Sequence, residues 1–488
     1  MGTGDSRTAE LTRLYHVGRA VLDQLQLQSS HALAMDDQPL PVFNNVGLVS
    51  PALATIPPHH PTMHHVTSRQ STDPPSLTHA TPVQMAHALQ DYARAQIYGV
   101  KYDQVAERWL VLFCQASMLG ALLQLGAPND PTNTNRWPDA IAVLDTALIM
   151  TGGPCRIRPW LLKLIDAVQD AVSAHRSLEA DSVTPLQAID TTPNAAAAIT
   201  ESLPLPFKGG GRDQGRYCNV PEWACPSVMA FAQHLLAPVA TLQESAAAIG
   251  PLPRLITGAL SHWPALSTRP WANLQYVQEA MGPSRLVPVE VGYQYTDAQW
   301  TQRFLQVDAF FRDYLAPSVR ADWSMVTHGA AAVLPTLRPA YLAQHDLLAQ
   351  MPRLARDVSV PDYCYSTTDD NAIAEPLIHA WFGPRYTVSP LHHDSYHNLL
   401  AQVVGFKYVR LYPPSETAKL YPFTDESSLL TNTSQVDLDH VDHSHFPEFT
   451  EAFYYECILQ PGQMLYIPPH WWHYVRSLST SFSLSFWF

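Results

Sequence analysis

The sequence predicts a chain with two structural classes: an α-helical region in the first half and a mostly β domain with flanking helices in the second. Residues 82–175 contain segments with apolar residues at three- and four-residue intervals, the period of an amphipathic helix. After residue 370, short apolar or alternating runs are separated by Gly and Pro at spacings of about 8–12 residues, which is typical of an antiparallel sandwich or barrel. The length of 488 residues also exceeds what a single core organises.

The composition limits the kind of partner that the chain can bind. Apolar residues make up 46% and charged residues 15%, so we expect most of the chain to fold. The net charge of −14 argues against strong direct binding of nucleic acid, because phosphate binding needs clustered Lys and Arg. A protein or peptide substrate, basic or histone-like, suits this charge better.

The cysteines and the apolar segments predict an intracellular protein. Six cysteines are scattered without a CxxC pair, which favours a reducing compartment over a disulfide framework. The first residues lack the apolar core of a signal peptide, and no run of 18 apolar residues predicts a membrane span.

The first half divides into three predicted regions. Residues 1–81 form a variable, partly disordered region, because residues 30–80 are rich in Pro, His, Thr and Ser and have no sustained period. Residues 82–175 form a helical domain. Residues 176–225 form a flexible linker, since this Ala/Thr/Pro-rich segment ends in PFKGGGRDQGRY and three successive glycines do not fit the interior of an element.

Residues 226–488 form the predicted β-rich domain. Two helical segments are expected near its start: VMAFAQHLLAPVATLQESAA and DAQWTQRFLQVDAFFRDYL. The expected strands are then IHAWFGP, NLLAQVVG, KYVRLYPP, FYYECILQPG, QMLYIPP, HYVRS and SFSLSFWF.

A candidate metal site lies in the motif Leu391-His392-His393-Asp394. On an extended strand, residues i and i+2 face the same way, so His392 and Asp394 project together. A third ligand, His473, is available in PPHWWHYVRS. Two histidines and one carboxylate, with open positions opposite them, are the ligand set of non-heme iron(II) oxygenases.

The H-x-D triplet alone is a weak signal. With 22 His and 43 acidic residues, roughly two H-x-[DE] triplets are expected by composition. A second triplet, His440-Val441-Asp442, lies in a polar stretch without flanking strand patterns, whereas His392 lies between strand-like segments. The sequence therefore favours His392 and Asp394 as the metal ligands.

The segment HAWFGPRYTVSPLHHDSYHNLLAQVVGFKYVRLYPP resembles the core of the jumonji-C family, and within it the jumonji domain-containing protein 5 group, also called lysine demethylase 8. The resemblance covers about 285–488, is weaker back to LITGALSHWP, and is specific in the order and spacing of its motifs. It implies that residues 226–488 form a jumonji-C catalytic domain with a double-stranded β-helix, a cupin-like jelly roll.

The resemblance also implies a cofactor set and its binding residues. Iron(II) is expected on His392, Asp394 and His473, with 2-oxoglutarate and O2 as cosubstrates. Residues expected to bind 2-oxoglutarate are Lys407 at the distal carboxylate, Tyr295 and Ser389 as hydroxyl donors, and Asn398 nearer the metal. The alternative for Lys407 is a solvated lysine at a strand edge. Trp381 and Trp487 are expected to line the pocket or the substrate cleft, with core packing as the alternative.

The implied function is that of a dioxygenase that hydroxylates a protein side chain, with arginine favoured, and releases succinate and CO2. One alternative is histone H3 lysine demethylation by N-methyl hydroxylation, which the group has also been assigned. Hydroxylation is favoured because no chromatin-reading finger accompanies the domain. A further alternative is a catalytically inert binding scaffold. The implied location is nuclear or cytoplasmic, and the sequence does not fix the oligomeric state.

Overall fold

The computed structural model describes two separate units of the chain. The described residues are 81–101, 104–125, 136–179, 188–189, 217–236, 251–292, 294–296, 299–319, 338–366, 373–424 and 430–488. One unit comprises Met1–Val183 with Ser284–Leu286, and the other comprises Thr184–Pro283 with Val287–Phe488. The predicted variable region, apart from its last residue, and most of the predicted linker lie outside the described residues.

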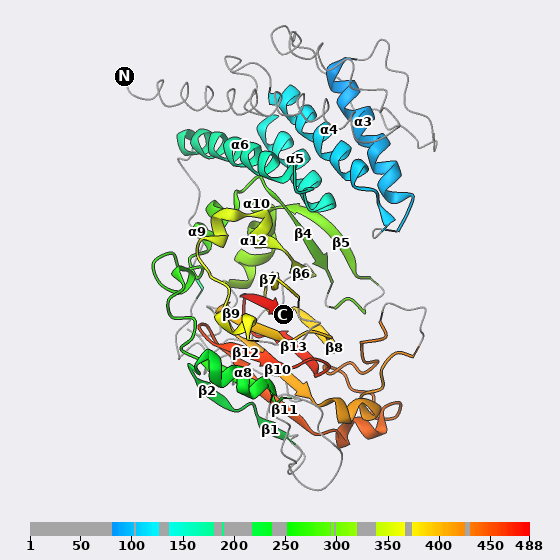
Figure 1. Ribbon diagram of the computed structural model, residues 1–488, viewed down its shortest axis with the longest axis vertical. Coiled ribbons are helices and arrows are strands. Elements are labelled where there is room, and N and C mark those ends of the chain that lie inside the picture. The colour runs from blue at the N-terminus through cyan, green and yellow to red at the C-terminus, as the bar shows by residue number, and fades with distance from the viewer. Residues whose placement is uncertain are drawn as a thin grey trace. The chain divides into compact units, whose positions relative to one another are not determined.

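Four helices form the described part of the first unit, as the sequence predicts for residues 82–175. They are α3 (Pro82–Tyr98), α4 (Glu107–Leu125), α5 (Trp137–Thr151) and α6 (Arg158–Glu179), and each contacts the next one along the chain (Figure 1). The start of α3 is fixed by a capping box, in which the Thr81 hydroxyl accepts from the Gln84 amide and the Gln84 side chain accepts from the Thr81 amide. The helical prediction is confirmed.

Helix α4 has buried residues on every face. By length and composition it is the one helix in the described part of the chain that is apolar enough to cross a membrane, although the sequence predicted no span. Two thirds of its apolar window, 67%, is buried within the protein. A helix at the centre of a helical domain has the same all-round apolar character.

The segment Ser284–Leu286, whose last residue begins strand β4 (Leu286–Val291), belongs to the helical unit. Arg285 donates from Nε and from its terminal nitrogen to the Asp145 carboxylate at 2.7–2.9 Å, and the Leu286 amide also donates to Asp145 at 2.9 Å. The two charged side chains are only 3% and 0% exposed. Both oxygens of the Asp145 carboxylate therefore accept hydrogen bonds, and such bonds are needed to offset the cost of burying an ion pair.

Two sheets make up the second unit. The five-stranded sheet has the order β1 (Tyr217–Asn219), β11 (Tyr454–Leu459), β10 (Lys407–Tyr412), β13 (Trp472–Ser477) and β8 (Val388–His392). The nine-stranded sheet has the order β2 (Glu222–Ala224), β3 (Arg254–Thr257), β12 (Met464–Ile467), β9 (Asn398–Val404), β14 (Ser481–Trp487), β7 (Leu377–Gly383), β6 (Ala340–His345), β4 (Leu286–Val291) and β5 (Thr301–Gln306).

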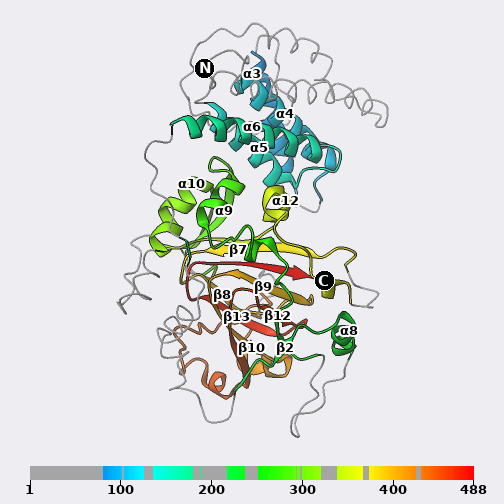
Figure 2. The ribbon, with the colours of Figure 1, turned by 90° about the vertical axis from the view of Figure 1, so that its left-hand side faces the viewer.

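The chain winds back and forth between the two sheets. From β7 to β10 successive strands alternate between the nine- and five-stranded sheets, and β12, β13 and β14 alternate again (Figures 1 and 2). Apolar side chains from β9 and β12 on one sheet and from β10 and β13 on the other pack into one cluster between them. This winding is the double-stranded β-helix, so the predicted fold class is confirmed.

Short helices cover the outer face of each sheet. The largest apolar cluster of this unit lies on the nine-stranded sheet. It includes residues of α8 (Val228–Leu236), η5 (Pro264–Leu266), α9 (Leu274–Met281), α10 (Val307–Phe310), η6 (Phe311–Leu315), α12 (Leu347–Gln350), α13 (Pro352–Ala355) and η7 (Asp362–Tyr365). On the five-stranded sheet, η8 (Pro414–Leu420) and η9 (Pro447–Glu451) bury a second cluster. The space between the sheets is therefore walled on both sides.

Two sequence predictions differ from the structure. Strands β1 and β2 lie within the predicted linker 176–225, and each pairs in parallel with an existing strand, β11 and β3 respectively. The predicted helix DAQWTQRFLQVDAFFRDYL is divided, since Thr301–Gln306 is strand β5 and only the part from Val307 is helical. In both cases a neighbouring strand supplies the hydrogen bonds, and this pairing overrides the local pattern.

Candidate metal centre

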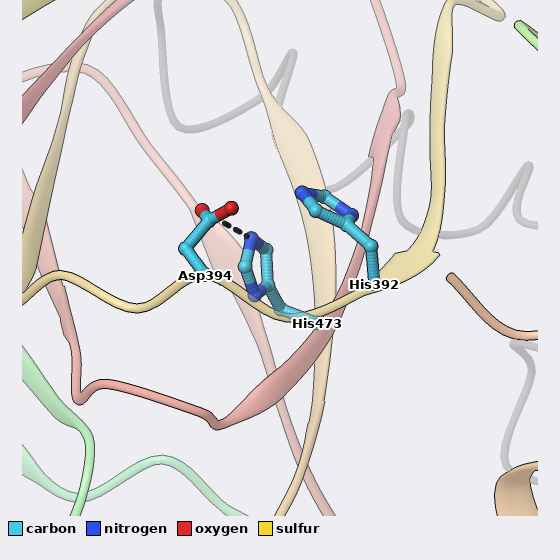
Figure 3. Close-up of side chains that lie close together, drawn as sticks. All are labelled: His392, Asp394 and His473. Atoms are coloured by element: carbon cyan, nitrogen blue, oxygen red, sulfur yellow. Dashed lines mark ion pairs between the residues drawn. The ribbon is translucent and has the colours of Figure 1, made fainter. Parts of the chain in front are cut away.

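The three predicted metal ligands lie together between the sheets. Strands β8 and β13 are antiparallel neighbours, and their register places His392 directly opposite His473. Asp394 follows two residues later, just beyond the end of β8. The three side chains point toward one another (Figure 3), and one ligand atom from each lies within 4.8 Å of the others. The His473 Nε2 atom is 3.6 Å from Asp394 Oδ2.

Backbone carbonyls orient both imidazoles. His392 Nδ1 lies 2.7 Å from the Pro390 carbonyl oxygen, and His473 Nδ1 lies 3.0 Å from the Trp471 carbonyl oxygen. A carbonyl only accepts hydrogen bonds, so each Nδ1 carries the proton and each Nε2 keeps a free lone pair for a metal. Burial, reinforced by the neighbouring His392, lowers the pKa of His473 to about 4 and keeps its ring neutral.

The donor set fits a divalent transition metal. Two neutral imidazole nitrogens and one carboxylate oxygen form the cluster, and within the described ranges no further His, Cys, Asp or Glu joins it. Three protein ligands leave the remaining coordination positions free for small molecules, the arrangement typical of non-heme iron(II) sites. The residues present therefore fit the iron predicted from the sequence.

A pocket opens beside the three ligands. It contains about 380 Å³ of unfilled space, part of which is open to solvent, and His392, Asp394 and His473 form one of its walls. Of the residues predicted to bind the cosubstrate or the substrate, five line this pocket: Trp381, Ser389, Asn398, Lys407 and Trp487. The structure thus brings together eight of the nine predicted site residues.

Lys407 is a buried cation in this pocket. Its side chain is 1% exposed, and its Nζ donates to the Tyr341 hydroxyl at 3.1 Å. No carboxylate in the described part of the chain lies within ion-pair distance of it, and burial lowers its pKa to about 7. A buried ammonium without a counter-ion is costly, so the pocket is suited to receive an anion. The alternative of a solvated lysine is wrong.

Tyr341, which the sequence reasoning missed, lies where a hydroxyl donor was expected. It lines the pocket, its hydroxyl contacts Lys407, and Ser389 forms a hydrogen bond with the same hydroxyl. Tyr295 does not line the pocket. Its hydroxyl lies 3.3 Å from Thr433 Oγ1, and Thr433 is bridged to His392 through the backbone. The tyrosine hydroxyl that contacts Lys407 is therefore that of Tyr341, and the expected role of Tyr295 in 2-oxoglutarate binding stays a prediction.

Two buried polar atoms of the pocket walls have no hydrogen-bond partner within the described part of the protein. They are Asn398 Oδ1 and Trp487 Nε1. Trp381, by contrast, is anchored, because its indole nitrogen donates to Ser485 at 2.9 Å. Buried polar atoms are usually paired, so the two unpaired atoms are consistent with a polar ligand in this pocket.

The second triplet of the sequence does not form a metal site. Asp442 accepts hydrogen bonds from the backbone and hydroxyl of Ser444, and its carboxylate contacts His445 Nδ1 at 2.6 Å. His440 is 87% exposed and lies near Asp437. His393 packs edge-on against Trp472 with ring centroids 4.6 Å apart. The prediction that His392 and Asp394, rather than this triplet, join a cluster is confirmed.

The fold and the cluster together define a double-stranded β-helix protein with a two-histidine, one-carboxylate site. The model of the cupin-like domain family matches residues 241–488, half of the chain, and the chain belongs to this family.

The chain is also similar in sequence to individual proteins that carry a jumonji-C domain or a lysine-specific demethylase name. The chain is 44% identical to lysine-specific demethylase 8 of Xenopus tropicalis over 268 residues, 55% of this chain and 52% of the relative. It is 44% identical to lysine-specific demethylase JMJ30 of Arabidopsis thaliana over 235 residues, 48% and 49% of the two chains. It is 37% identical to Jumonji C domain-containing protein 5 of Drosophila melanogaster over 291 residues, 60% and 65%. The matched regions thus span between 49% and 65% of these relatives, and the predicted resemblance is confirmed.

Proposed function

We propose that the protein is an iron(II)- and 2-oxoglutarate-dependent dioxygenase that hydroxylates a side chain of a protein substrate. One observation carries the proposal: the triad of His392, Asp394 and His473 shares a pocket with Lys407, a buried cation without a carboxylate partner in the described chain. The first group fits the metal, and the second fits the distal carboxylate of a dicarboxylic acid.

Each pocket residue then has a physical role. His392, Asp394 and His473 would hold iron(II), which when bound supplies the redox chemistry that couples O2 to the conversion of 2-oxoglutarate into succinate and CO2. Lys407, with the hydroxyls of Tyr341 and Ser389, would fix the distal carboxylate and so orient the cosubstrate. The unpaired Asn398 Oδ1 faces the same pocket. Trp381 and Trp487 exclude water from it.

Charge near the pocket favours a basic side chain as the group that is modified. Glu290 on β4 pairs directly with Tyr341 across the strands, and burial raises the pKa of its carboxyl group. A cation entering beside it would favour the ionised carboxylate. The net charge of −14 also favours basic peptides. Arginine is the residue that we propose.

The alternative, removal of a methyl group from lysine, is favoured by the names of two relatives, both lysine-specific demethylases. Both reactions begin with hydroxylation of a C–H bond, on a side-chain carbon that is not bonded to nitrogen in arginine and on the N-methyl carbon in methylated lysine. An arginyl product keeps the added oxygen, whereas an N-methyl product loses formaldehyde. The free cysteines, three of them exposed, fit an intracellular location for either activity.

The test combines metal binding with turnover. Wild type, His392→Ala and His440→Ala are titrated with iron(II) under anaerobic conditions in the presence of 2-oxoglutarate, and then given arginine- and lysine-containing peptides in air. We expect iron binding and succinate release in wild type and in His440→Ala, because residue 440 is exposed outside the cluster. His392→Ala should lose both.

Mass spectrometry of the peptides separates the reactions. Gain of one oxygen on an arginine supports the proposal, and loss of a methyl from lysine with formaldehyde release supports the alternative. Binding of iron and 2-oxoglutarate without turnover of any peptide would indicate an inert binding scaffold. Equal iron binding by wild type and His392→Ala would refute the metal assignment.

A further inference from the structure

A second pocket lies at a strand edge next to the metal pocket. Strand β7 pairs with β14 along its whole length, from Leu377 to Gly383. On its other side, the pairing with β6 extends only to Ala380, because the chain leaves β6 after His345 and enters α12. Within the described ranges, residues 377–379 therefore present an open strand edge.

Apolar side chains surround this open edge. The pocket, with about 920 Å³ of space that includes open solvent, is walled by α12, α13 and the segment after them on one side and by the start of β7 on the other. Several of its apolar residues are only half-buried, and Leu377 is 44% exposed. Asp346, an exposed carboxylate, lies at its rim. Partly exposed apolar walls beside a free edge are what an extended peptide requires.

An aromatic contact joins the lining of this pocket to the lining of the metal pocket. His379 lines the second pocket, and its ring contacts Trp487, which lines the metal pocket, at a centroid distance of 4.8 Å. Tyr396, 37% exposed, stacks on the same Trp487 at 5.6 Å. The linings of the two pockets therefore meet where His379 contacts Trp487.

We propose that an extended stretch of the polypeptide substrate adds to the open edge of β7 at residues 377–379 and places an apolar side chain in the second pocket. The substrate's basic residue then enters the metal pocket on the other side of Trp487; this part rests on the proposed function. Backbone pairing gives affinity for any extended chain, and the apolar pocket selects for Leu, Ile, Val or Met at a fixed distance from the basic residue.

The experiment measures peptide retention and does not depend on turnover. An array of peptides, each with one arginine or lysine between randomised residues, is probed with full-length wild type, Leu377→Ser and Phe304→Ser. Phe304 on β5 is a matched control, since it is 45% exposed on another strand of the same sheet. We expect wild type and Phe304→Ser to retain peptides with an apolar residue at one fixed distance from the basic residue. The amount of these peptides that Leu377→Ser retains should be about fivefold lower, because the variant loses part of the apolar contact that one leucine makes.

Hydrogen exchange tests the strand addition directly. A retained peptide should slow exchange of the amides in 377–379 and leave those of β5 unchanged. The proposal is overturned if no peptide is retained, if retention shows no apolar preference, if Leu377→Ser binds like wild type, if Phe304→Ser loses as much, or if exchange at 377–379 does not slow. If iron binding or turnover is absent but the preference for an apolar residue is kept, the proposed function is refuted. The proposal of peptide binding at the edge of β7 is then unaffected.

Discussion

Lys407 shows how a single residue determines which small molecule the pocket accepts. Its ammonium is buried next to the Tyr341 hydroxyl, without a carboxylate partner among the described residues. Desolvation disfavours the charged form, and a bound carboxylate would restore it. A carboxylate bound in this pocket would therefore favour the charged form of Lys407.

Replacing Lys407 with Met should weaken the proposed binding of 2-oxoglutarate and leave the metal site intact. Loss of a charge-assisted hydrogen bond is worth about 1.5–3 kcal/mol, so we expect the Kd of 2-oxoglutarate to rise by roughly 10- to 100-fold. Calorimetric titration measures this Kd. The control is Lys419→Met, because Lys419 is a partly exposed lysine that pairs with Glu416 on η8. Equal affinity in the two variants would contradict the role of Lys407.

The binding of 2-oxoglutarate should take up a proton above neutral pH. Burial lowers the pKa of Lys407 to about 7 in the empty pocket, so the amine is largely neutral at pH 8. A bound carboxylate raises this pKa, so the affinity should fall as the pH rises above 7 and be greatest below it. Calorimetry at pH 8 in two buffers with different ionisation enthalpies measures the uptake. Identical binding enthalpies in the two buffers would show that no proton is taken up.

Residue types at recognisable spacings made most of the site predictable. His392 and Asp394 are two positions apart, so the sequence alone points to them, whereas Lys407 was expected from the order and spacing of the motifs that resemble the jumonji-C family. Tyr341 was not predicted, because its role depends on a strand pairing with Glu290 and on a hydroxyl contact with Lys407 across 66 residues of sequence. A tyrosine in an apolar strand does not show which neighbour it will contact.

At the scale of elements, the turn between β9 and β10 positions Lys407. Gly405 in this turn has φ +73°, and a Cβ on it would lie 2.1 Å from the Thr480 carbonyl oxygen. Two backbone segments thus approach each other at a point where only glycine fits. The strand that carries Lys407 begins two residues later.

Gly405→Ala should destabilise the β unit more than a comparable change elsewhere. Gly462 has φ +82°, but its added Cβ would meet nothing nearer than Leu266 at 3.9 Å. We expect Gly462→Ala to cost about 1–2 kcal/mol, the penalty of the left-handed conformation, and Gly405→Ala roughly 2–4 kcal/mol more because of the clash. Urea denaturation measures both. Similar midpoints for the two variants would contradict the close approach.

Short strands limited what could be predicted at this scale. β1 and β2 have three residues each, too few for an alternation of apolar and polar residues to be recognised. They form because β11 and β3 have free edges with which they pair. The apolar residues of β5 are spaced in a way that also suits a helix. Its position next to β4 in the sheet makes this segment a strand. The longer strands β9, β10 and β14 were predictable because both of their faces are buried and apolar runs mark them.

At the scale of the whole molecule, the described chain divides into a helical unit and a β-rich unit, each with its own buried apolar residues. The sequence predicted this division from the change in period between the two halves. It did not predict that Ser284–Leu286 belongs to the helical unit, since the buried ion pair of Arg285 with Asp145 joins residues 140 positions apart.

Asp145→Ala should destabilise the helical unit selectively. It removes the carboxylate partner of the buried Arg285 guanidinium, and breaking a buried ion pair costs about 3–5 kcal/mol. Amide hydrogen exchange measures the local stability of the two units separately. We expect faster exchange in α5 and α6, with little change in β9 and β10. The control is Asp91→Ala, because Asp91 is 72% exposed and its pair with Arg94 lies on the surface. Uniform acceleration in both cores would show that the pair does not act on the helical unit alone.

The facing positions of His392 and His473 have a consequence for how such proteins diversify. Eighty residues of sequence separate the two histidines, yet only the alignment of β8 with β13 sets the distance between them. Loops in the intervening stretch can lengthen or shorten without displacing either imidazole, whereas a slip of one position between the two strands would turn one ring to the opposite face. The loops around the pocket can therefore change in length and sequence while the three candidate metal ligands keep their geometry.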